Sequence, residues 1–117
     1  MKALMMLILL GALSLAASQV SAAVRRFTLV TDALNGTTIW YPPSFTVHQG
    51  EKVVLTLINK LDEPHGFKLE DFGITEVVQP KTQTTVTVTA SKTGLHNFRC
   101  HLHPQHLGGQ LLVLPTR

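Results

Sequence analysis

The sequence predicts an all-β fold, a Greek-key β-sandwich of about seven or eight strands. Three observations lead to this prediction. Short runs rich in valine and threonine alternate apolar and polar side chains, as half-buried strands do. Turn signals such as Asn35-Gly36 and Gln49-Gly50 separate these runs at short intervals. The chain after residue 23 shows no apolar stripe with the spacing of an amphipathic helix.

The expected strands follow one another along the chain. The clearest runs from Lys52 to Asn59, where valine and leucine at every second position suit a face packed on a core. Threonine alternates with valine in the run 82–89, and the apolar run 110–114 suits a strand in the middle of a sheet. The other expected strands cover residues 27–31, 44–47, 66–69, 75–78 and 94–100. We expect the aromatic side chains of Trp40, Tyr41 and Phe45 to belong to the core.

Residues 1–22 have the features of a secretory signal peptide. Lys2 supplies a positive start, an apolar run covers residues 3–17, and small residues surround Ala22 and Ala23. The apolar run is shorter than the roughly 20 residues that span a bilayer. We therefore expect cleavage after Ala22 or Ala23, which leaves residues 23–117 as one domain without an integral membrane segment. This domain is expected to be periplasmic or otherwise exported.

The charge of the chain argues against a nucleic-acid partner. The sequence contains 10 lysine and arginine residues and 7 aspartate and glutamate residues. Loss of Lys2 with the signal peptide leaves 9 basic against 7 acidic residues, a net charge of +2. The basic residues are scattered and form no run that would follow a phosphate backbone.

A cysteine and two histidines close to the C-terminus have the spacing of a metal-binding loop. Cys100 is the only cysteine, so it cannot form a disulfide within the chain, and His103 and His106 follow it at three-residue intervals. Thiolate and imidazole groups are ligands that suit copper and zinc. His65 follows an Asp-Glu-Pro turn and begins an expected strand, where it could approach the loop. The sequence therefore predicts a metal site of His65, Cys100, His103 and His106.

The other polar side chains are expected to have ordinary roles. His101 should point to the side of its strand opposite Cys100, at the surface or beside the site. His48 and His96 are expected to be exposed. No Ser/His/Asp arrangement or phosphate loop accompanies the acidic residues, so we expect solvated charges rather than acid/base catalysts at Glu63, Glu70, Asp71 and Glu76.

The pattern Phe98-x-Cys100-x-x-His103-x-x-His106, with His65 upstream and the segment 42–51 before a strand, resembles the cupredoxin family. The resemblance covers essentially the whole of residues 23–117. It implies a cupredoxin domain that holds one copper ion per chain, although the same donors would also suit zinc. The loop spacing is similar to that of amicyanin, in which a methionine occupies the place of His106.

The resemblance extends to the red copper protein nitrosocyanin. The segments 66–78 and Leu102-His103-Pro104 are similar to segments of that protein, whose ligands are a glutamate, a cysteine and two histidines. The glutamate is replaced here by His65. The nitrosocyanin loop has more residues between its two histidines, so the resemblance leaves His106 either as a ligand or beside the ligands. As a ligand, His106 is a stronger donor than the usual axial methionine, which implies a lower reduction potential and a green or red centre.

The resemblance implies three possible functions. The first is a periplasmic one-electron carrier that exchanges electrons with an unidentified periplasmic redox protein. The second is a nitrosocyanin-like protein with an open coordination position for nitric oxide or another small molecule. The third is a module that binds and delivers copper or zinc. We expect electron transfer or copper binding rather than enzymatic catalysis.

Overall fold

The computed structural model describes Gly11 and residues 23–117. The expected signal peptide lies outside the described residues except for Gly11, and stays a prediction. The described chain forms nine strands and one short 3-10 helix. In order, these are β1 (Val24–Leu34), β2 (Thr37–Tyr41), β3 (Ser44–His48), β4 (Lys52–Asn59), β5 (His65–Leu69), η1 (Glu70–Phe72), β6 (Ile74–Val78), β7 (Gln83–Thr89), β8 (Gly94–Arg99) and β9 (Gly109–Leu114).

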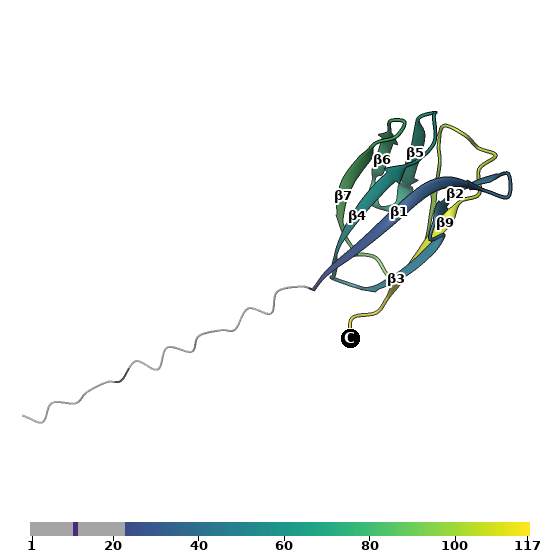
Figure 1. Ribbon diagram of the computed structural model, residues 1–117. Helices are drawn as coiled ribbons and strands as arrows, with labels where there is room; N and C mark the ends of the chain where they lie inside the picture. Colours follow the sequence, from purple (N-terminus) through teal and green to yellow (C-terminus); the bar gives the residue numbers. More distant parts are fainter. Residues whose placement is uncertain (1–10, 12–22) are drawn as a thin grey trace, which may run out of the picture.

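The strands form two sheets that pack together as a β-sandwich (Figure 1). The order in the first sheet is β2-β1-β4-β7, and in the second it is β3-β9-β8-β5-β6. Strands β1 and β4 are parallel, as are β3 and β9, whereas the other paired strands are antiparallel. The predicted all-β sandwich is therefore confirmed, and the last strand lies inside its sheet as expected.

The core follows from the alternation of side chains along each strand. In β4, Val53, Leu55 and Leu57 are fully buried, while the residues between them are only partly buried. Burial of each such side chain stabilises the fold by about 1.5–3 kcal/mol. The buried apolar residues of both sheets are Leu29, Trp40, Phe45, Val47, Val53, Leu55, Leu57, Phe67, Leu69, Val78, Val86, Ala90, Phe98, Leu111 and Val113.

Strand β2 was not among the strands that the sequence predicted. It pairs antiparallel with β1 through a tight turn at Asn35 and Gly36, which both have positive φ values, 50° and 77°. An Asn-Gly pair between two strand-like runs is a strong hairpin signal, so the turn itself could have revealed the strand. The expectation that Tyr41 is a core residue is wrong, because this residue at the end of β2 is 58% exposed. Trp40 and Phe45 are buried as expected.

The topology gives the sandwich two distinct poles (Figure 1). The first pole carries the start of β5, the end of β8 and the loop between β8 and β9. The second pole carries the starts of β1 and β4, which are paired with each other. It also carries the ends of β3 and β9, which are likewise paired with each other. Within residues 23–117, no helix has the length and apolar character needed to cross a membrane.

Candidate metal centre

Four potential metal ligands meet at the first pole. His65 is the first residue of β5, and Cys100 directly follows β8; each of these residues is only 3% exposed. His103 and His106 lie in the loop that joins β8 to β9, and both are half-buried. The structure thus brings all four predicted residues together, although His65 is 35 residues from Cys100 in the chain.

The donor atoms of these residues are close enough to bind one ion. One donor atom from each of the four residues lies within 4.8 Å of every other. The Sγ atom of Cys100 is 3.4 Å from Nδ1 of His103 and 4.0 Å from Nδ1 of His65. The ring of His106 stacks on that of His103, with 4.6 Å between the ring centroids. Cys100, His65 and His103 therefore form a compact group, with His106 adjoining it.

This geometry fits a metal with nitrogen and sulfur ligands. A tetrahedral ion with bonds of about 2.0 Å to nitrogen and about 2.3 Å to sulfur holds those two atoms roughly 3.5 Å apart. The two measured sulfur–nitrogen distances lie on either side of this separation. One thiolate with three imidazoles is a donor set that suits copper or zinc, and does not suit calcium or magnesium.

The surroundings keep two of the imidazoles neutral. Burial lowers the pKa of His65, and the neighbouring His103 and His106 lower it further. Burial is also the main reason that the pKa of His106 is lowered, with His103 again contributing. A neutral imidazole is the form that binds a metal, so the pocket favours the protonation state that a ligand needs.

Backbone and aromatic groups support the sulfur ligand. The N–H of Gly66 donates a hydrogen bond to Sγ of Cys100 at 3.2 Å. The carbonyl of the same glycine accepts a hydrogen bond from Nε1 of Trp40 at 2.9 Å. The ring of His101 packs closely against Gly66. A Cβ atom at this position would be only 2.4 Å from Nδ1 of His101. Sequence reasoning missed these roles of Trp40 and Gly66, since neither residue type is a metal ligand.

A carboxylate lies behind His103. The Nε2 atom of His103 is 3.6 Å from a carboxylate oxygen of Glu63. Because Nδ1 of the same ring faces Cys100, the glutamate lies on the side of the imidazole away from the sulfur. A carboxylate in this position can fix the orientation of a ligating histidine. Glu63 is exposed, as the sequence predicted, but it is also adjacent to the site.

The other three histidines lie outside the four-residue cluster. His101 is half-buried beside Gly66, and its Nδ1 atom is buried without a hydrogen-bond partner among the described residues. His48, which was expected to be exposed, is half-buried at the opposite pole. The expectation that His96 is exposed is wrong: it is buried, and its ring nitrogens lie 2.6 Å from a carboxylate oxygen of Asp71 and 2.9 Å from the carbonyl of Lys92.

The fold and the site together define a two-sheet β-sandwich with a Cys/His metal-binding cluster at one pole. Residues 3–113 match the family described as the cupredoxin-like domain. The chain belongs to this family, and the family and the donor set together indicate copper as the metal of the cluster.

The chain is also similar in sequence to a part of larger curated proteins, and its fold is similar to that of several solved structures. The chain is 32% identical to nitrous-oxide reductase of Stutzerimonas stutzeri over 79 residues, which cover 62% of this chain and 12% of the reductase. Its fold is similar to that of the multicopper oxidase mgLAC, with a TM-score of 0.69 and 16% identity over 81% of this chain and 40% of the oxidase. It is also similar to the metal-binding domain of the Cu(I)-exporting P-type ATPase of Streptococcus pneumoniae D39, with a TM-score of 0.66 and 17% identity over 82% of this chain and 91% of that domain.

Proposed function

We propose that this domain is a periplasmic one-electron carrier in which His65, Cys100, His103 and His106 bind a single copper ion. The observation that carries the proposal is the convergence of four donor atoms within 4.8 Å of one another. Bound copper would supply a couple that accepts and releases one electron. The task of the protein is then to hold the same ligand arrangement in both oxidation states.

The positions of the ligands suit this task. His65 is fixed at the start of β5, where it pairs with Val78 of β6. Cys100 is buried and receives a hydrogen bond from Gly66. Side chains that are packed and hydrogen-bonded in this way have little freedom to move when the charge of the site changes. A small rearrangement between the two states is what fast electron transfer requires.

The loop also offers a route to a partner. His103 and His106 are half-buried, so they extend from the interior of the pole toward its surface. Leu102 and Leu107 of the same loop are exposed. An unidentified periplasmic redox protein could contact this loop and exchange electrons through a histidine ring.

A second candidate is supported by a cleft beside His106. This cleft has a volume of about 690 Å³, and its walls include Pro43, Arg99, Pro104 and His106. A small molecule such as nitric oxide could reach the site from this cleft, as a nitrosocyanin-like protein with an open coordination position would require. The donor set alone would also serve a copper or zinc delivery module, since one thiolate and three imidazoles complete a tetrahedral zinc site.

Metal analysis of protein purified from the periplasm, combined with optical and EPR spectra and a redox titration, tests these functions. The carrier requires about one copper per chain, a sulfur-to-copper charge-transfer band and a reversible one-electron wave. A copper centre that binds nitric oxide or exchanges water would favour the second function. Zinc in place of copper, or irreversible redox behaviour, would contradict electron transfer.

A further inference from the structure

We propose that a cationic cleft at the second pole, opposite the metal centre, binds a phosphate group, either as free inorganic phosphate or as a lipid headgroup. The cleft has a volume of about 640 Å³. Three arginines and a histidine surround its one carboxylate. The complete lining is Val24, Arg25, Arg26, Phe27, Thr46, His48, Glu51 and Arg117.

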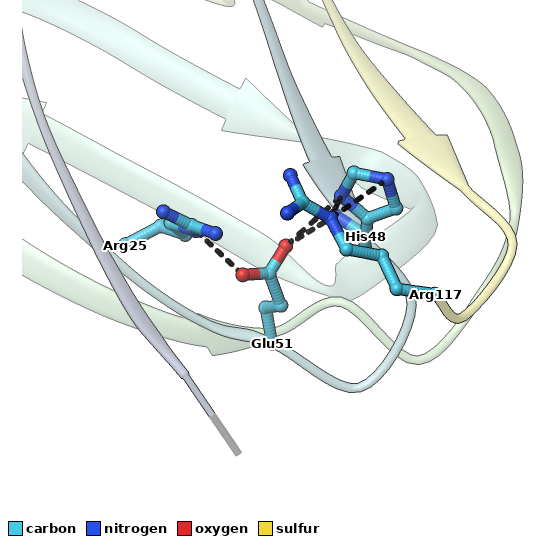
Figure 2. Close-up of polar contacts among 4 residues, drawn as sticks. All are labelled: Arg25, His48, Glu51 and Arg117. Atoms are coloured by element: carbon cyan, nitrogen blue, oxygen red, sulfur yellow. Dashed lines mark hydrogen bonds and ion pairs between the residues drawn. The ribbon is translucent and has the colours of Figure 1, made fainter.

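The carboxylate of Glu51 is already engaged within the protein (Figure 2). Its Oε2 atom accepts a hydrogen bond from Nε of Arg25 at 2.5 Å, and its Oε1 atom accepts one from the backbone N–H of His48 at 2.6 Å. Glu51 is only 7% exposed. It therefore positions Arg25 at the edge of the cleft, and has little capacity left to neutralise the other arginines.

Two arginines remain without an acidic partner. Arg26 and Arg117 form no ion pair within residues 23–117. The Nε atom of Arg117 is 3.3 Å from both ring nitrogens of His48, and Figure 2 draws these two contacts. This arrangement holds Arg117 near Glu51 and Arg25. Positive charges gathered in this way repel one another, and a bound anion would relieve the repulsion.

The chemistry of the cleft points to phosphate. The side chains of three arginines against one glutamate give the lining a net charge of 3 − 1, or +2, which suits both the single negative charge of a phosphodiester headgroup and the higher charge of inorganic phosphate. Guanidinium groups bind phosphate oxygens with two parallel hydrogen bonds. The hydroxyl of Thr46 is a further donor on the lining. The apolar side chains of Val24 and Phe27 complete the cleft and could contact the glycerol portion of a headgroup.

Calorimetric titration of the purified full domain with inorganic phosphate, at constant ionic strength, tests the site. We expect saturable binding that Arg117→Gln weakens by roughly tenfold or more, because the variant removes a charge-assisted hydrogen bond to the phosphate oxygens. Arg117 is exposed, so this variant should keep its fold, and far-UV circular dichroism checks that it does. Lys60→Gln is the matched control, since it removes one exposed positive charge that lies just after β4, at the first pole.

Vesicles distinguish the two sources of the phosphate group. Binding to phosphatidylglycerol vesicles but not to phosphatidylcholine vesicles, weakened by Arg117→Gln, would identify a lipid headgroup. Binding to inorganic phosphate alone would identify a soluble ligand.

The proposal is overturned if neither phosphate nor phosphatidylglycerol binds, or if Lys60→Gln weakens binding as much as Arg117→Gln. The copper site takes no part in these measurements, so failure of the proposed electron-carrier function would not affect the result.

Discussion

The N–H of Gly66 donates a hydrogen bond to Sγ of Cys100, and this contact joins the two strands that supply the buried ligands. Gly66 directly follows His65 in β5, whereas Cys100 directly follows β8. The carbonyl of Gly66 is held in turn by Trp40, which belongs to β2 in the other sheet. The geometry at the sulfur therefore depends on the packing of one sheet on the other.

Replacing Trp40 with Phe should disturb the metal centre from a distance. The ring still fills the core, but the carbonyl of Gly66 loses its donor, which should lower the free energy of unfolding by about 1–3 kcal/mol. Gly66 is then less firmly held, so we expect a shift in the sulfur-to-copper charge-transfer band and in the reduction potential. Urea unfolding and optical spectra measure the two effects. Val47→Ala, a core change in β3, should destabilise the domain without moving the band; the same spectrum in all three proteins would contradict the role of Trp40.

Removal of the sulfur tests the central ligand. We expect Cys100→Ala to abolish the charge-transfer band, while far-UV circular dichroism shows an intact sandwich, because strands on both sides close the loop. His101→Ala changes the adjacent residue, which lies outside the cluster, and should keep the band. A band that survives in Cys100→Ala would refute the assignment.

The convergence of the three loop residues could be predicted from the sequence because their separation along the chain is short. Cys100, His103 and His106 follow one another at three-residue intervals in one loop, so their spacing indicated that they lie near one another. The alternation in β4 likewise predicted its bounds correctly, Lys52–Asn59.

Features that depend on contacts between distant strands could not be found in this way. The role of Gly66 arises only when β5 pairs with β8, and that of Trp40 only when the sheets pack. The contact of His96 with Asp71 joins residues that lie 25 positions apart in the chain. A single sequence contains no periodic signal for such pairings, since they depend on the register of the whole sandwich.

Changing His106 to Met should make the centre more like a blue copper site. A thioether is a weaker donor to Cu(II) than an imidazole, so we expect a higher reduction potential and a band shifted toward blue absorption. Voltammetry and optical spectra measure these changes. His48→Met introduces the same side chain at the opposite pole and should leave both unchanged. If His106→Met also leaves both unchanged, His106 is not a ligand.

Gly66 should tolerate a side chain only if His101 is made smaller. A Cβ atom at Gly66 would lie 2.4 Å from Nδ1 of His101, so Gly66→Ala must displace the imidazole or the strand. We expect it to reduce stability by about 1–3 kcal/mol and to shift the charge-transfer band. In the double variant with His101→Ala, both effects should be partly reversed. The four proteins form a thermodynamic cycle, and strictly additive losses in stability would show that the two residues do not interact.

Glu51 should make the stability of the domain depend on pH in the acid range. The backbone N–H of His48 and the side chain of Arg25 lower the pKa of Glu51 from its ordinary value of 4.5. A carboxyl group with a lower pKa in the folded state stabilises the fold at pH values above the unfolded-state pKa. This contribution is lost as the pH falls through the folded-state pKa.

The variant Glu51→Gln lacks this titration, so we expect its stability to fall less steeply with decreasing pH than that of the wild type. Urea unfolding of the metal-free proteins between about pH 6 and about pH 3 measures the two slopes. Glu70→Gln removes an exposed carboxylate that forms only a long ion pair of 3.8 Å with Lys68, and this variant should retain the steeper wild-type slope. Equal slopes in the wild type and Glu51→Gln would show that the contacts of Glu51 with Arg25 and His48 do not stabilise the fold.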